Sequence, residues 1–197
     1  MEKSKKEAIY RILTYFIICS FLGWIFETAE ILLSTGILTN RGLLFALKPL
    51  GHYFPTLNKF PLIAKLPFVW GLPMINIYGF GGTLIYLFLG KMRNQYIKVF
   101  FIGMVSMTIF ELLGSYLCTE VIHRTFWDYS DRFLNYDGRI CLLSSIAWGL
   151  LSLFMVDFIA PKIEDLFERE EDKKYFFAIV NIIIVYAIIC SIFKYIL

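Results

Sequence analysis

The chain has 197 residues, of which 58% are hydrophobic and 18% aromatic, and its mean hydropathy is +0.67. Soluble domains contain about 45–50% apolar residues, so this composition excludes an ordinary soluble domain and predicts a polytopic membrane protein. The net charge of +3 is grouped along the chain, so the positions of the charges are more informative than their sum. The four cysteines form no CxxC pair, and we predict no metal, no cofactor and no nucleic-acid partner.

Apolar segments recur along the chain at roughly the length that crosses a bilayer, which is about 20 residues for a helix. The predicted fold class is therefore all-α, a polytopic membrane helical bundle of about five transmembrane helices in a single integral domain over residues 1–197. The predicted spans are Ile9–Ser34, Met74–Gly90, Lys98–Val121, Ile140–Ala160 and Tyr175–Ile196.

The distribution of lysine and arginine predicts the orientation, because cytoplasmic loops carry an excess of positive charge. Placing the N-terminus inside puts eleven of the 19 basic residues in short cytoplasmic tracts. We predict a multi-pass protein of the plasma membrane with a cytoplasmic N-terminus and an external C-terminus. The stretch "KIEDLFEREEDKK" is then a cytoplasmic linker, and its mixed charges are typical of a solvated helical turn or two.

The predicted external segment Thr35–Pro73 contains proline at positions 49, 55, 61, 67 and 73. Proline removes a backbone donor and biases the preceding residue away from the helix. Irregular backbone is not tolerated in contact with lipid, because its unpaired groups are costly in hydrocarbon. We therefore expect short broken helices at the outer interface or in protein-lined space.

Small and polar residues follow helical spacing on four of the five predicted helices. Such faces allow membrane helices to approach closely, and intramembrane acids lie on them. We expect a compact bundle with a polar interior, and a fifth helix that is peripheral or contacts another copy. The four faces are Ser20, Gly23, Glu27, Glu30 and Ser34; Asn76, Gly79, Gly82 or Thr83, Tyr86 and Gly90; Gly103, Met107, Glu111, Gly114 and Cys118; and Ser145, Gly149 and Ser152.

A short internal repeat relates the two halves of the chain. Ile-Phe-Glu occurs twice, ending at Glu27 and Glu111, and each copy is followed by an arginine beside glycine, Arg41 and Arg139. Each unit crosses the membrane twice, so we predict a parallel repeat. Its first copy covers about residues 9–90, its second about 98–160, and an extra peripheral helix covers 175–196.

The repeat pairs Glu27 with Arg41 and Glu111 with Arg139, since a carboxylate in a low dielectric must be paired or protonated. These pairs are either structural or line an outward-facing site for an ion, a proton or a polar substrate. Asp128, in "FWDYSD", is either part of that site or part of a turn beside an interfacial aromatic anchor. The candidate substrate- or ion-binding residues are Glu27, Glu111, Arg41, Arg139, Asp128, Asn76 and Tyr78.

Several motifs occur in an order that resembles a known family: "FLGWIFE", "NRG", the stretch Pro73 to Gly81, "WDYS", "GRICL" and "WG". In this order they resemble the CmpB-type family of small membrane proteins, which is described as type IV ABC-transporter permeases. The resemblance covers about Phe21–Gly149 and implies a small all-helical membrane bundle. The chain departs from the family pattern by the insert Leu43–Leu72, and by Asn76 where the family tends to have proline.

Three functions remain open from the sequence. The first is a membrane transport protein, either a permease subunit or a small channel, with the lipid bilayer as its environment and a homodimer as its expected assembly. Because the chain lacks GxxxxGK[ST], ATP coupling would need a separate ATPase subunit. The second is a membrane-embedded enzyme acting on a lipid or polyprenyl phosphate headgroup, with arginines holding phosphate. The third is a structural subunit of a membrane complex.

Overall fold

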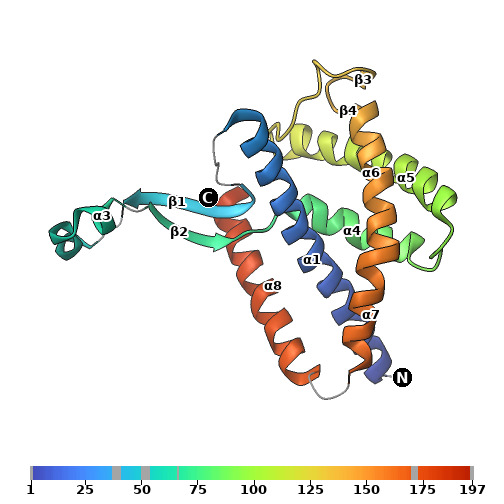
Figure 1. Ribbon diagram of the computed structural model, residues 1–197, viewed down its shortest axis with the longest axis horizontal. Helices are drawn as coiled ribbons and strands as arrows, with labels where there is room; N and C mark the ends of the chain where they lie inside the picture. The colour runs from blue at the N-terminus through green and yellow to red at the C-terminus, as the bar shows by residue number, and fades with distance from the viewer. Residues whose placement is uncertain (1, 37–40, 50–53, 66, 170–172, 196–197) are drawn as a thin grey trace.

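Long helices account for most of this computed structural model, which describes residues 2–36, 41–49, 54–65, 67–169 and 173–195 (Figure 1). We call the end of the bundle where α1 and α8 finish the loop end, because the connecting loop, residues 122–139, also lies there (Figure 1). The main helices are α1 (Glu2–Thr35), α4 (Asn76–Leu89), α5 (Tyr96–Tyr116), α6 (Leu142–Phe154) and α8 (Lys173–Tyr195). The predicted helical membrane bundle is therefore confirmed.

Four helical stretches of the described chain are long and apolar enough to cross a membrane, namely Lys5–Thr35, Tyr96–Val121, Leu142–Glu168 and Lys174–Lys194. The remaining predicted span becomes α4, which has only 14 residues. At about 1.5 Å per residue, it is shorter than a full bilayer crossing. It starts late because Pro73 follows a strand and the backbone at Ile75 is still extended. Ile196, the predicted end of the last span, lies outside the described residues.

Two helices continue through π-helical turns, the first to Val121, its predicted end, and the second past its predicted end at Ala160. The π-helix η2 (Leu117–Val121) extends α5, and the π-helix η3 (Met155–Ile159) joins α6 to α7 (Ala160–Glu168). Pro161 explains the second, because proline has no N–H and its ring crowds the carbonyl four residues earlier. The predicted solvated linker is thus partly a continuation of a membrane helix, and residues 170–172 of it lie outside the described residues.

An arm made of a β-hairpin leaves the bundle between α1 and α4. Its strands β1 (Leu43–Pro49) and β2 (Pro67–Leu72) pair antiparallel, and the short helices η1 (Pro55–Lys59) and α3 (Pro61–Ala64) form its tip. The short broken helices expected here are present. The strands were not predicted from the proline spacing. Pro49 and Pro67 are paired at the far end of the two strands, where proline is tolerated because a backbone hydrogen bond between the strands can be lost there.

The helices pack as two antiparallel pairs, α1 with α4 and α5 with α6. A Cβ atom at Gly82 would collide with Cys19 of α1, and one at Gly103 would collide with Ser152 of α6. Glycine therefore sets the distance between the helices in both pairs, as the small-residue faces predicted. The repeat that these two pairs resemble stays a prediction.

A polar network holds together the end of the bundle that lies away from the loop end. Arg11 of α1 forms an ion pair with Glu164 of α7, and the Tyr86 hydroxyl lies 3.1 Å from the same carboxylate. The Tyr86 ring stacks on Tyr15 at 3.8 Å between centroids. These contacts fix α1, α4 and α7 relative to one another at the end of the bundle away from the connecting loop.

We expect Gly82→Ala to lower the stability of the protein by about 1–3 kcal/mol, the usual cost of overpacking. The added methyl group would meet both side-chain atoms of Cys19, which the α1 backbone holds in place. Thermal unfolding in detergent measures the change. Gly114→Ala is the matched control, because its methyl group would meet only the flexible end of Ile77 at 3.4 Å. Equal unfolding temperatures for the two variants would contradict the packing argument.

Candidate functional site

Glu27, near the loop end of α1, forms an ion pair with Arg41, which precedes the arm. The Arg41 Nη1 atom lies 2.8 Å from Glu27 Oε2, and the Glu27 side chain is 24% exposed. No acidic residue occurs between Glu30 and Glu111, so the carboxylates available to Arg41 from its own part of the chain are those of α1. The structure therefore contains the first of the two glutamate–arginine pairs considered from the sequence.

Glu111 lies on the buried face of α5 and is only 5% exposed. The hydroxyl of Tyr129, in the connecting loop, donates a 3.0 Å hydrogen bond to Glu111 Oε1. Burial raises the pKa of the Tyr129 hydroxyl, and the neighbouring Glu111 raises it further, so Tyr129 keeps its proton and remains a donor. Glu111 Oε2 forms no hydrogen bond of regular geometry in the described part of the chain, and Ser144 and Trp148 of α6 also interact with this carboxyl group.

Tyr78 on α4 interacts with both acids, Glu27 and Glu111, and Tyr129 is close to both carboxylates as well. The Tyr78 ring packs over Gly23 of α1, where a Cβ atom would collide with it. We call Glu27, Tyr78, Glu111 and Tyr129, together with Arg41, the acid cluster. It joins α1, α4, α5 and the connecting loop at the loop end of the bundle.

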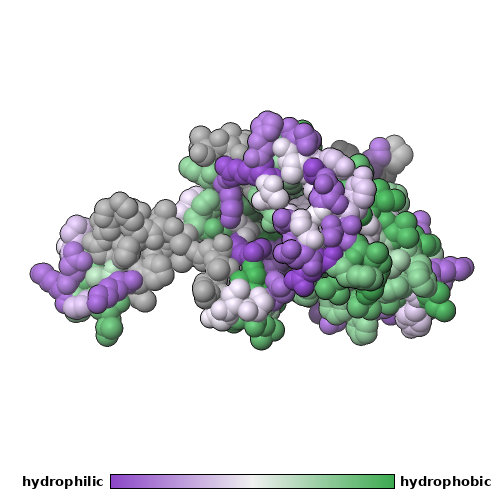
Figure 2. Space-filling model, turned by 90° about the horizontal axis from the view of Figure 1, so that it is seen from above, coloured by the Kyte–Doolittle hydropathy of each residue, from purple (hydrophilic) through white to green (hydrophobic). Residues whose placement is uncertain are grey.

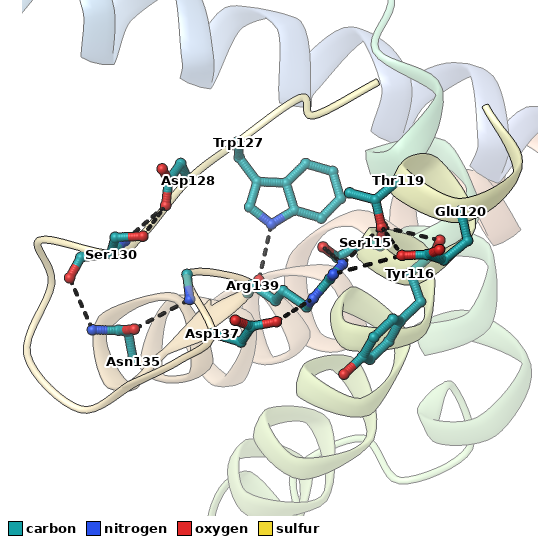
Figure 3. A network of polar contacts seen from close by, with 11 residues as sticks. Ser115, Tyr116, Thr119, Glu120, Trp127, Asp128, Ser130, Asn135, Asp137 and Arg139 are labelled. Atoms are coloured by element: carbon teal, nitrogen blue, oxygen red, sulfur yellow. Dashed lines mark hydrogen bonds and ion pairs between the residues drawn. The ribbon is translucent and has the colours of Figure 1, made fainter. Parts of the chain in front are cut away.

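The predicted ion pair between Glu111 and Arg139 is wrong. Arg139 instead contacts α5 beyond Glu111, where its Nη1 atom lies 3.2 Å from Ser115 Oγ and 2.9 Å from Thr119 Oγ1 (Figure 3). Its Nε donates to Asp137 at 2.9 Å, and its guanidinium stacks over the Tyr116 ring. The repeat fails here because the second arginine has an acid two residues away, whereas Arg41 has none nearby in its segment.

The connecting loop is tied together by its own polar groups (Figure 3). Trp127 Nε1 donates to the Arg139 carbonyl at 2.9 Å. Asp128 accepts hydrogen bonds from the backbone and hydroxyl of Ser130, and these bonds lower the pKa of its carboxyl group. Asp128 is exposed and closes a turn, as one of the two interpretations of "FWDYSD" proposed.

Asn76 lies outside the acid cluster. Its amide donates a 3.1 Å hydrogen bond to Ser191 of α8, so it joins α4 to the last helix. Of the seven candidate residues, the structure brings together Glu27, Arg41, Tyr78 and Glu111, and it places Arg139, Asp128 and Asn76 in other contacts.

Tyr129 is the cluster residue that the sequence analysis missed. It stands inside "WDYS", which was interpreted as an anchor, and nothing in the spacing links it to α5. No group of three or more metal-ligating side chains occurs in the residues that the structure describes. A pocket of about 780 Å³ lies at the opposite end of the bundle, beside the Tyr86–Glu164 contact and lined also by Lys91, Arg93 and Asp165.

We expect Arg139→Lys to loosen the connecting loop, because an ammonium group cannot reach Ser115, Thr119 and Asp137 at once. Amide hydrogen exchange over residues 127–139 should become about tenfold faster, which corresponds to about 1.4 kcal/mol of local opening free energy. Hydrogen exchange with mass spectrometry measures this. Arg132→Lys is the control, because Arg132 is exposed in the same loop. Equal exchange in the two variants would contradict the role of Arg139.

Comparison with known proteins identifies a family for this chain. A family described as "Putative ABC-transporter type IV", the CmpB family, matches residues 14–195. A search of curated proteins and a search of solved structures each found no match. The matched region includes the acid cluster, the arm and the last helix. The chain therefore belongs to the CmpB family of ABC-transporter-related membrane proteins, and it is a multi-pass membrane protein.

Proposed function

We propose that this protein is a transport component of its membrane, and that the acid cluster binds a proton or a monovalent cation. The observation that supports this most directly is a charge imbalance. The cluster holds two carboxylates but one arginine, and Arg41 is paired with Glu27. No ion pair joins Glu111 to a basic side chain within the described residues, so its charge needs another partner.

A further cation at this end of the bundle, on α8, does not supply that partner. Lys194 of α8 donates to the carbonyl of Gly42 and lies beside Arg41. Within the described chain it forms no ion pair with either glutamate. A proton or a small cation at Glu111 would balance the site without moving a helix.

Tyr129 gives the proposed site a link to the outside. It belongs to the connecting loop, and its hydroxyl reaches the buried carboxylate at 3.0 Å. Movement of this loop would break that hydrogen bond and open Glu111 to water. In a permease, which is the role that the family description suggests, the connecting loop would then act as the gate. We include in this proposal an outward-facing cavity at the acid cluster.

Partners belong to the proposal as well. The family suggests an ATPase partner, and the chain itself carries no P-loop motif. Such a subunit would dock at the end away from the connecting loop, where α7 and the α4–α5 turn lie. A homodimer is the simplest assembly for a chain with so few membrane helices.

In proteoliposomes carrying a pH-sensitive dye, we expect the wild-type protein to dissipate an imposed pH gradient or to take up radiolabelled Na⁺ or K⁺. Glu111→Gln and Glu27→Gln should each lower that flux by about tenfold or more, since losing one charge-assisted contact of about 1.4 kcal/mol has this effect. The matched control is Glu30→Gln, which removes an exposed carboxylate from the same helix.

The control should transport like the wild type. Unchanged flux in both cluster variants would remove the glutamates from the mechanism. Wild-type vesicles that move neither protons nor these cations would contradict the proposal as stated.

Tyr129→Phe should lower the same flux severalfold, because it removes the hydrogen bond to Glu111 while keeping the ring. Tyr136→Phe changes an exposed tyrosine of the same loop and serves as its control. If both variants transport alike, the hydroxyl of Tyr129 has no part in the pathway.

A further inference from the structure

The arm is fixed to the bundle at its base, where it packs against the second half of α8, as far as its last turn. The Trp70 ring lies between Phe45, stacked at 4.3 Å, and Phe193 of α8, edge-on at 5.7 Å. The Gly71 N–H donates to the Tyr186 hydroxyl at 3.2 Å. These contacts hold the base of the arm against the final part of a helix that is long enough to span the bilayer.

The direction of the arm then determines its depth. Figure 1 shows the hairpin leaving sideways from the end of α8, and Figure 2 shows it standing apart from the bundle in a second view. The end of a spanning helix lies at the headgroup level of the membrane. An arm that runs sideways from this point lies along the membrane surface, beside the apolar flank of the bundle.

The tip of the arm is apolar and uncovered. Leu62 is 86% exposed and Phe60 60% exposed, and the side chains of Phe54 and Ile63 are also exposed. Helices η1 and α3 are too short to bury these side chains against each other. Such a surface is unfavourable in water and favourable in the interface of a bilayer.

The charge of the arm fits the same environment. Residues 41–73 contain four basic residues, Arg41, Lys48, Lys59 and Lys65, and no aspartate or glutamate. Of these, Lys59 and Lys65 lie at the tip, next to the exposed apolar side chains, and are themselves exposed. A segment of aromatic and aliphatic side chains flanked by lysine is typical of peptides that lie in a membrane surface with anionic lipid.

We propose that the tip of the arm inserts into the bilayer surface, with Phe54, Phe60, Leu62 and Ile63 among the acyl chains and Lys59 and Lys65 on anionic headgroups. The bilayer is favoured over a second protein because the arm leaves the bundle beside Phe193 and Lys194, at the end of a helix that is long enough to span the membrane. Inserted in this way, the arm fixes the height and the rotation of the bundle in the membrane. This role is independent of the acid cluster.

The test places a fluorescent label at the tip of the full-length protein. Leu62→Cys carries an environment-sensitive nitrobenzoxadiazole label, in a Cys118→Ser background because the other native cysteines are buried. Asp131→Cys, at an exposed site in the connecting loop, is the matched control. Both proteins are reconstituted in vesicles of phosphatidylcholine mixed with phosphatidylglycerol, and in vesicles of phosphatidylcholine alone.

We expect doxyl-labelled lipid to quench the Leu62 label severalfold more strongly than the Asp131 label, and aqueous iodide to show the opposite order. The double variant Lys59→Glu and Lys65→Glu should reduce lipid quenching at Leu62 in the vesicles with phosphatidylglycerol, and have little effect in phosphatidylcholine alone. If transport is lost while the quenching at Leu62 is unchanged, the result bears on the proposed function of the acid cluster and does not contradict insertion of the arm.

Two outcomes would overturn the proposal. The first is iodide quenching at Leu62 as strong as at Asp131, which would place the tip in water. The second is protection from both iodide and lipid that disappears when the protein is diluted to one copy per vesicle, which would place the tip against a second copy of the chain.

Discussion

Close contact between helix backbones is the constraint on which the rest of this structure depends. α1 approaches α4 where Gly23 and Gly82 leave room for Tyr78 and Cys19, and α5 approaches α6 where Gly103 leaves room for Ser152. Lipid provides no hydrophobic force between helices, so van der Waals contact at small residues must hold them together. This spacing also brings Glu27 and Glu111, carried by two different helices, close enough for both to interact with Tyr78.

The two acids are treated differently by their surroundings. Glu27 has an arginine and partial exposure, whereas Glu111 has a tyrosine hydroxyl from a loop and almost no exposure. The difference comes from the loops that follow each acid. The first lacks carboxylates, which leaves Arg41 to the glutamate on α1. The second contains Asp137, which contacts Arg139 together with Glu120 of η2. Two similar sequence units therefore give one acid that is paired with an arginine, Glu27, and one that is not, Glu111.

The arm and the connecting loop lie at the same end of the bundle and are linked through α8. The Arg124 side chain donates to the Lys194 carbonyl, and the Lys194 side chain donates to the Gly42 carbonyl at the start of the arm. Figure 2, which looks onto this end, shows hydrophilic residues gathered over the bundle and hydrophobic residues along its flank. The arm and the connecting loop are thus joined through the end of α8.

Periodic apolar segments determined the helices of this protein, because they depend on the regular 3.6-residue turn. The spacing of glycine, serine and glutamate determined the buried faces only in part, since Ser20 and Gly23 are buried but Glu30 and Ser34, on the same predicted face, are exposed. The π-helical turn before Pro161 also follows from local chemistry, although its position was not predicted. Tertiary structure alone decided that Tyr129 reaches Glu111, that Arg139 does not, and that the proline-rich insert forms a hairpin. These outcomes depend on which groups meet across loops of irregular backbone, where no sequence period fixes the direction of a side chain.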